Sequence, residues 1–217
     1  MNPTTEATGV ILAGGESRRM GQNKLPLKVG DTGLLDRVHE ALASRCAETL
    51  VVGAGEHLPT TARLVPDLRP GRQGPLAGIE AGLSAASYRH VFVAAGDMPF
   101  LTADLVGYLL GLLTEDVPAV VPDIGDRPHP LCAAYGREAL PAVSAALDRG
   151  VRSVRDLLES LPGVRYVGQK ELERLGDPNL LLTNVNSPED LARAEAALRG
   201  SAPLGDVPGE GMYRGEG

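Results

Sequence analysis

The sequence predicts an α/β protein, a Rossmann-like three-layer sandwich in which helices cover both faces of a mostly parallel central sheet. Two observations support this fold class. Short apolar runs alternate along the chain with longer segments whose apolar residues recur at helical spacing. Some runs, such as residues 91–95, are apolar throughout, which is typical of parallel strands buried on both faces. We expect one domain over residues 1–199, followed by a mobile Gly- and Pro-rich tail over 200–217.

The first half of the chain contains most of the predicted strands. Apolar runs predict strands at 9–13, 49–52, 64–65 and 91–95. Apolar residues at helical spacing predict a helix over 33–46 and another that includes 79–86, after a stretch of breaker residues at 70–78. A third helix is expected after Thr102, because a Thr side chain can cap a helix start.

The second half continues the same pattern. The predicted elements are strands at 119–121 and 131–135, a helix at 137–147, a short helix that ends near Leu161, and a strand or turn at 180–186. Arg152 and Arg155 are expected on the short helix, as a solvated face or as a site for a second anion. The Ser-Pro-Glu-Asp sequence at 187–190 predicts a capped last helix that extends to Leu198.

Composition and charge narrow the classes of function. Apolar residues make up 43% of the chain and aromatic residues 3%, so the core is expected to be aliphatic. The formal net charge of −7 argues against binding of nucleic acid through overall positive charge. Cys46 and Cys132 are too few for a disulfide framework and do not form a C-x-x-C pair. With no leader or membrane-spanning stretch, we expect a cytoplasmic protein without membrane or nucleic-acid partners.

The strand at 9–13 leads into a loop that is rich in glycine and basic residues. The residues concerned are Gly14, Gly15, Arg18, Arg19, Gly21 and Lys24. Glycine lets the backbone approach a ligand closely, and Arg and Lys side chains bind phosphate. The spacing fits neither a Walker A loop nor the dinucleotide-binding fingerprint. A plain glycine-rich turn is the alternative, but glycines and cations together after a buried strand favour a phosphate-binding loop.

Asp97 follows the strand at 91–95 and is the candidate metal ligand. Ligands of open α/β sheets bind at the carboxyl ends of the strands. One carboxylate there suits a Mg²⁺ ion that also binds phosphate oxygens and water. An Asp that only accepts N–H bonds in a turn is the alternative, and the phosphate-type loop on the same sheet favours the metal.

Two further stretches are candidates for ligand contact. The glycine-rich residues 70–78 open into a helix whose free N–H groups suit an anion or a base edge, although an ordinary turn explains them equally well. His129 lies between two prolines in the polar loop 123–130. No partner histidine is near it in the sequence, which disfavours a metal site and leaves contact with an extended substrate.

Four motifs together resemble the molybdenum cofactor guanylyltransferases, the MobA type of nucleotidyltransferase. They are Leu-Ala-Gly-Gly at 12–15 with Arg-Arg-Met-Gly at 18–21 and Lys24, Gly-Pro-Leu-Ala-Gly at 74–78, Gly-Asp-Met-Pro at 96–99, and Asn-Val-Asn-Ser-Pro-Glu at 184–189. The resemblance covers about residues 9–198 and implies a nucleotide-diphospho-sugar transferase type of fold. It implies that GMP is transferred from GTP to the phosphate of Mo-molybdopterin, with release of pyrophosphate. Molybdoenzymes or their chaperones are then the expected partners that receive the product.

The resemblance implies a role for each matching residue. Those that would contact the nucleotide are Leu12, Ala13, Gly14, Gly15, Lys24, Asp67 and Gly78. Asp97 would bind Mg²⁺ and act in catalysis with Lys24 and Arg19, while Asn184 and Asn186 would lie near the cofactor half of the site. Gly53 departs from the family, which often has Asn after the second strand, so a side-chain contact to the nucleotide is missing there or is replaced by a backbone contact.

The implied chemistry needs no general base, because the nucleophile is already an anionic phosphate. Transfer of this kind requires positioning and neutralisation of phosphate charge. Three alternatives stay open: a cytidylyltransferase of the same family, a nucleotidyltransferase that uses another phosphorylated acceptor, and a non-catalytic nucleotide-binding module. Intact Lys24 and Asp97 argue against the last of these.

Overall fold

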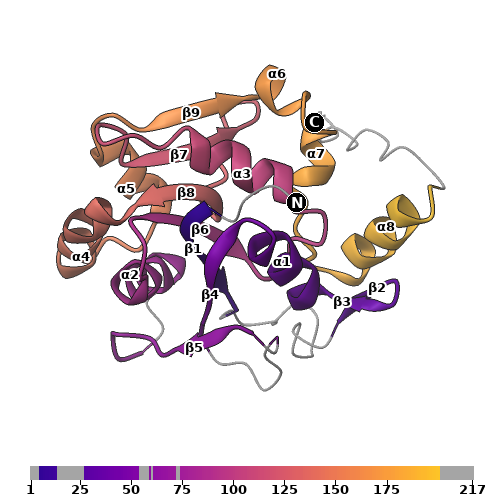
Figure 1. Ribbon diagram of the computed structural model, residues 1–217, viewed down its shortest axis with the longest axis horizontal. Helices are drawn as coiled ribbons and strands as arrows, with labels where there is room; N and C mark the ends of the chain where they lie inside the picture. Colours follow the sequence, from indigo (N-terminus) through magenta and orange to yellow (C-terminus); the bar gives the residue numbers. More distant parts are fainter. Residues whose placement is uncertain (1–4, 14–26, 54–58, 60, 72–73, 201–217) are drawn as a thin grey trace, which may run out of the picture.

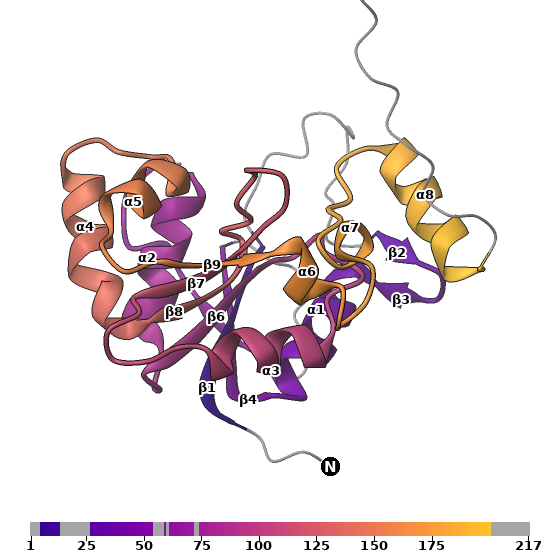
Figure 2. The same ribbon diagram turned by 90° about the horizontal axis from the view of Figure 1, so that it is seen from above.

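The computed structural model describes residues 5–13, 27–53, 59, 61–71 and 74–200. Its centre is a seven-stranded sheet in the order β5-β4-β1-β6-β8-β7-β9, with helices on both faces (Figures 1 and 2). The strands are β1 (Thr5–Leu12), β4 (Cys46–Val52), β5 (Arg63–Val65), β6 (His90–Ala95), β7 (Ala119–Asp123), β8 (Cys132–Gly136) and β9 (Arg165–Gly168). Neighbouring strands are parallel except for β8, which is antiparallel to both β6 and β7. The predicted fold class is therefore confirmed.

Two aliphatic layers, one on each face of the sheet, form the core. On one face α1 (Leu34–Ala43) and α3 (Ala103–Gly111) pack on side chains such as Ile11 and Phe92. On the other face α2 (Pro75–Ala85), α4 (Leu140–Asp148) and α5 (Val154–Ser160) pack on Val10 and Val93. Consecutive side chains of a strand point to opposite faces, so the uninterrupted apolar runs at 10–12 in β1 and 91–95 in β6 fill both layers.

The carboxyl ends of the parallel strands meet at one edge of the sheet, which we call the ligand edge. Backbone hydrogen bonds continue the sheet beyond the strands there. The N–H of Ala13 donates to the oxygen of Val52 at 2.9 Å, and the N–H of Gly96 donates to the oxygen of Leu12 at 3.1 Å. These bonds fix the backbone at Ala13 and Gly96, where the chain leaves β1 and β6.

A small second layer lies beside the ligand edge. It consists of the hairpin β2 (Lys28–Val29) and β3 (Thr32–Gly33), packed against α8 (Pro188–Leu198) (Figure 2). The remaining elements are a 3-10 turn η1 (Arg137–Ala139) and the short helices α6 (Gln169–Leu172) and α7 (Pro178–Leu181). Ser187 caps α8 by accepting from the N–H of Asp190 at 3.1 Å, as the sequence predicts.

The structure differs from the sequence-based expectations in several elements. Of the two forms expected for residues 180–186, the strand is absent: α7 includes Leu180 and Leu181, and a turn follows at Leu182. Arg152 precedes Ser153, which caps α5, so Arg152 and Arg155 do not share a helix. The hairpin β2–β3 and the edge strand β9 were not predicted, since neither has an apolar run. The predicted tail falls largely in 201–217, outside the described residues, and the domain boundary at 199 stays a prediction.

No helix in the described ranges has the length and apolar character needed to cross a membrane.

Candidate functional site

The end of β1 forms the floor of the candidate site. Leu12 and Ala13 are partly exposed at the ligand edge, held between Val52 of β4 and Gly96 after β6. The predicted phosphate-loop residues Gly14, Gly15, Arg19 and Lys24 lie outside the described residues. Their loop returns at Leu27, whose oxygen accepts from the N–H of Leu34 at the start of α1 at 2.9 Å.

Gly78 lies directly against Leu12, so two predicted nucleotide contacts are neighbours in space. A Cβ atom at Gly78 would lie 3.0 Å from Cδ2 of Leu12, which explains why glycine fits at this point of α2. The helix begins at Pro75, further back than the apolar spacing from Ile79 indicates, with Gly74 as its N-cap residue at φ +78°. Its first-turn N–H groups lack intrahelical partners and are available to an anion or a base edge.

Asp97 and Asn184 are far apart in the sequence and in direct contact in the structure. The side-chain N–H of Asn184 donates to Oδ1 of Asp97 at 2.9 Å. The backbone N–H of Val185 donates to the backbone oxygen of Asp97, also at 2.9 Å. Two hydrogen bonds therefore join the candidate metal ligand to the segment expected near the acceptor, and the bond from Asn184 restricts how the Asp97 carboxylate is oriented. Asn186 is exposed, and its N–H donates to Oδ2 of Asp190 at 2.9 Å.

A small apolar cluster packs next to the contact between Asp97 and Asn184. Its buried members are Val29, Leu34, Val185 and Ala194, and Leu27, Phe100 and Leu191 pack against them. The cluster therefore combines residues next to three parts of the site: the end of the loop 14–26, the segment after Asp97, and the segment that contains Asn184. Arg37 adds two hydrogen bonds to the oxygen of Val29, from Nη2 at 2.8 Å and from Nε at 3.2 Å.

Asp67 lies after β5 and is exposed. Two residues later, Arg69 binds Glu80 of α2 and Asp148 of α4. Sequence patterns do not indicate these three residues, because an ion pair between a loop and two helices produces no local spacing pattern. A lone basic residue next to a candidate site residue was the available signal.

The β7–β8 hairpin extends the ligand edge on the side away from α2. Its tip is a tight turn in which Ile124 and Arg127 exchange backbone hydrogen bonds, with Gly125 and Asp126 at positive φ. Burial lowers the pKa of His129, and the Arg127 cation adds to this effect, so the imidazole is neutral near pH 7. His129 follows the turn and leads into β8, where contact with an extended substrate stays a prediction.

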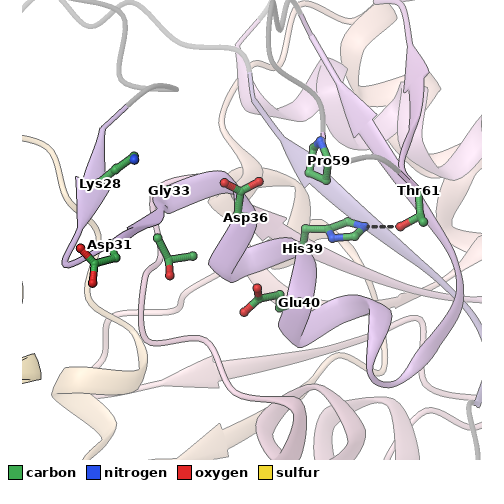
Figure 3. Close-up of a pocket in the computed structure, with 9 residues that line it drawn as sticks. Lys28, Asp31, Gly33, Asp36, His39, Glu40, Pro59 and Thr61 are labelled. Carbon is green, nitrogen blue, oxygen red and sulfur yellow. Dashed lines mark hydrogen bonds between the residues drawn. The ribbon is translucent and has the colours of Figure 1, made fainter.

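A surface cavity of about 470 Å³ lies beside α1 and the β2–β3 hairpin (Figure 3). Its charged lining consists mainly of Asp31, Asp36 and Glu40, with Lys28 as a cation. His39, also in the lining, lies 3.0 Å from the Thr61 hydroxyl. Three carboxylates repel phosphate, and no predicted site residue lines the cavity, so it is not the candidate site.

Comparison with known proteins agrees with this arrangement. The family model of the MobA-like NTP transferase domain matches residues 9–164. A relative from Pelotomaculum thermopropionicum, named as a probable molybdenum cofactor guanylyltransferase, is 38% identical over 198 residues, which cover 90% of this chain and 95% of the relative. The molybdenum cofactor guanylyltransferase of Desulfosudis oleivorans is 36% identical, with 88% and 96% covered.

Solved structures give the same result for the fold. The molybdopterin-guanine dinucleotide biosynthesis protein A from Archaeoglobus fulgidus is similar with a TM-score of 0.75 at 28% identity, over 89% of this chain and 99% of that chain. A 2-C-methyl-D-erythritol 4-phosphate cytidylyltransferase from Thermus thermophilus shares the fold alone, with a TM-score of 0.64 at 23% identity, over 88% and 98% of the two chains. The family match over most of the chain, together with the ligand edge that unites Leu12, Gly78, Asp97 and Asn184, shows that the chain belongs to the MobA-like family and is a nucleotidyltransferase.

Proposed function

We propose that the protein transfers GMP from GTP to the phosphate of Mo-molybdopterin and releases pyrophosphate. The printed names of the most similar relatives support this substrate pair. The observation that carries the proposal is the contact of Asp97 with Asn184, because it joins the candidate metal ligand to the segment expected to bind the acceptor. A phosphate acceptor near Asn184 and a nucleotide near Leu12 would then meet beside Asp97.

In the proposed reaction an oxygen of the acceptor phosphate attacks the α-phosphorus of GTP. A new P–O bond forms as the bond from the α-phosphorus to the bridging oxygen of pyrophosphate breaks, so the leaving group departs with its electron pair. Lys24 and Arg19 would stabilise the negative charge on the α-phosphate and on pyrophosphate. The free N–H groups at the start of α2 would face the base or the ribose of GTP.

The residues present fit a Mg²⁺ ion. Mg²⁺ commonly binds proteins through one or two carboxylates and takes its other ligands from phosphates and water. Asp97 is partly exposed at the ligand edge, so its carboxylate can reach an ion that also binds water and phosphate. Asp97 would hold the ion, which would act as a Lewis acid on phosphate oxygens, and Asn184 would keep the carboxylate in place.

Pyrophosphate release in the presence of purified Mo-molybdopterin and either GTP or CTP tests the proposal. We expect GTP turnover to exceed CTP turnover and the dinucleotide product to contain guanine. Faster turnover with CTP would contradict the proposal in favour of the cytidylyltransferase alternative. Turnover of another phosphorylated acceptor in preference to Mo-molybdopterin would contradict the proposed acceptor. Delivery of the product to molybdoenzymes or their chaperones stays a prediction.

A further inference from the structure

A cluster of charged side chains ties the segment that carries Asp67 to two helices. We call Arg69, Glu80, Ser144 and Asp148 the Arg69 cluster. Nε and Nη2 of Arg69 donate to Oε2 and Oε1 of Glu80, each at 2.7 Å, so the two planar groups meet through parallel hydrogen bonds. Nη1 of Arg69 donates to Oδ1 of Asp148 at 2.7 Å, and Nη2 also lies 3.3 Å from the backbone oxygen of Ser144.

The contact with Glu80 is buried and depends on both charges. The Glu80 side chain is 6% exposed and the Arg69 side chain 25% exposed. Hydrogen bonds from Arg69 lower the pKa of Glu80, although burial acts in the opposite direction, so the ion pair persists at neutral pH. A Lys at position 69 would retain a positive charge but not the planar pair of donors.

Apart from the contacts of Arg69, the segment around Asp67 buries few side chains. Residues 66–71 form neither helix nor strand, and Pro66, Asp67 and Leu68 are exposed. Leu68 is 54% exposed, so it adds little packing. Asp67 therefore lies between two anchored residues: Val65, which is buried at the end of β5, and Arg69, whose ion pairs hold the chain two residues further along.

The same helix carries the other features expected to contact the nucleotide. Glu80 lies in α2, two residues after Gly78, and Gly74 caps the start of this helix. The Arg69–Glu80 contact thus fixes Asp67 relative to the first turn of α2 and to Leu12 beneath Gly78. None of its hydrogen bonds involves Asp97 or Asn184.

We propose that Arg69 is a positioning residue for the nucleotide half of the site, which sets nucleotide affinity and the discrimination between GTP and CTP. This inference rests on the proposed function for the identity of the two substrates. It predicts an effect on the nucleotide half that is separate from the acceptor half.

Kinetics of Arg69→Lys and Arg69→Met, with GTP or CTP and with Mo-molybdopterin, test this role. We expect both variants to raise the KM for GTP by about tenfold or more, since small displacements of positioning groups have large effects. The KM for Mo-molybdopterin should stay within about twofold, and the ratio of kcat/KM for GTP to that for CTP should fall. Arg69→Lys should recover part of the loss. An unchanged KM for GTP would overturn the proposal.

Arg89 provides a matched control. It also binds two carboxylates, Glu138 at 3.0 Å and Glu115 at 3.0 Å, but it lies just before β6, at the opposite end of the sheet. Arg89→Met should leave the KM for GTP unchanged. An equal rise in the KM for GTP in both Met variants would show a general effect on stability and would overturn a positioning role.

A double variant keeps the test valid if Arg69→Met fails to fold. Loss of Arg69 alone leaves the Glu80 charge buried without its partner, whereas apolar replacement of both members of a buried pair is often tolerated. Arg69→Met combined with Glu80→Met should therefore fold and still show the raised KM for GTP. A folded double variant with wild-type KM for GTP would overturn the inference.

Failure of the proposed function is distinguishable from failure of this inference. If the wild-type protein prefers CTP, the proposed function is wrong. The variant-to-wild-type ratio of dissociation constants, measured by titration calorimetry with the preferred nucleotide, then tests the role of Arg69 without any acceptor. A ratio near one would overturn the role of Arg69, and a ratio of about ten or more would support it.

Discussion

Asp97 is oriented by a neighbour that comes from the far end of the described chain. Its carboxylate accepts from Asn184, and its backbone oxygen accepts from Val185. Sequence comparison places the two residues in separate motifs with separate expected roles. The structure shows them in one hydrogen-bonded unit, so a change at either residue should affect both halves of the reaction.

Asp97→Ala should reduce pyrophosphate release by at least about a thousandfold, because loss of a single electrostatic contact costs on the order of 2.7–4 kcal/mol and the proposed metal ligand would also be lost. Thermal unfolding should remain cooperative, since the backbone bond from Val185 to residue 97 is retained. Pyrophosphate release and differential scanning calorimetry provide the two measurements. Wild-type turnover would remove Asp97 from the metal role.

Asn184→Ala should weaken Mg²⁺ binding and raise the Mg²⁺ concentration needed for half-maximal activity. The variant removes the N–H that binds the Asp97 carboxylate without adding a new ligand, and loss of a partner that orients a metal ligand typically costs about 10–100-fold in affinity. Mn²⁺ binding measured by electron paramagnetic resonance gives a readout independent of turnover. Asn179→Ala in α7, where the side chain is exposed, is the control, and equal Mn²⁺ affinity in both variants would contradict the orienting role.

Gly53 shows how a departure from a family pattern can have a backbone origin. Its φ of +103° lies in a region that side-chain-bearing residues rarely adopt. Its N–H donates to the oxygen of Val65 at 3.4 Å, which continues the pairing of β4 with β5. An Asn at this position would strain the turn, so a nucleotide contact from its side chain would require a different backbone path.

Helix α2 packs closely on the sheet. Gly78 faces Leu12 and Gly82 faces Val10, so the helix rests on β1 through two positions without side chains. This packing explains how a helix that begins at the ligand edge keeps its first turn next to the end of β1. It also explains why apolar spacing was a poor guide to the start of this helix, since its first turn contains Pro75 and Gly78.

Gly82→Ala should destabilise the protein by about 1–3 kcal/mol through overpacking. A Cβ atom there would lie 2.6 Å from Cγ1 of Val10, which is part of a central strand and can move little. Gly111→Ala, at the end of α3, is the control, because a Cβ atom there would meet nothing within 4 Å. Urea unfolding of both variants gives the comparison, and equal midpoints would contradict the packing explanation.

Sequence patterns predicted strands well where both faces of the strand are buried, and poorly where only one face is buried. The central strands β1, β4 and β6 each end in an uninterrupted apolar run, and all three were predicted from these runs. β9 buries Val167 while Arg165 and Tyr166 stay exposed, so no run of apolar residues indicates an edge strand. The stretch Leu180 to Leu182 looks like a strand by composition, but the capping contact of Asp177 with the N–H of Asn179 at 2.9 Å starts a helical turn instead.

For the molecule as a whole, Glu48 links separate parts of the sheet. Its carboxylate accepts from Thr8 at 2.7 Å, Arg63 at 2.9 Å, and the Ser87 N–H and hydroxyl at 2.9 and 3.0 Å. Partial burial raises the pKa of Glu48, but these hydrogen bonds outweigh that effect and hold it at about 2. The charged form of Glu48 therefore stabilises the fold.

Glu48→Gln should make global stability less sensitive to acid. The folded-state pKa lies below the ordinary value of 4.5, so the stabilisation is complete above that value and is lost as the pH falls from 4.5 through about 2. The wild-type protein should lose on the order of 3 kcal/mol from this group over that window, and the variant should lose none of it. Thermal unfolding at pH 6 and pH 3 measures the difference. Glu115→Gln, whose carboxylate is 86% exposed, is the control, and parallel acid profiles for wild type and Glu48→Gln would exclude the role.

The fold class and the order of the central elements follow from the sequence because alternation and burial are local patterns. The contacts among the site residues, by contrast, cannot be predicted from local patterns in the sequence. Motif resemblance predicted that Asp97 and Asn184 belong to the site, but only the three-dimensional arrangement shows the hydrogen bond between them. The Arg69 cluster has neither a local pattern nor a motif, so it is visible only in the structure.

The first strand of the chain lies in the middle of the sheet, between β4 and β6. During synthesis β1 can pair on one side once β4 has left the ribosome, but its other edge stays open until His90–Ala95 emerge. An open apolar edge is prone to intermolecular pairing, and long-range parallel pairing forms slowly. Nascent chains that stop before β6 are therefore expected to need chaperone protection, and fragments truncated there should aggregate rather than form a smaller domain.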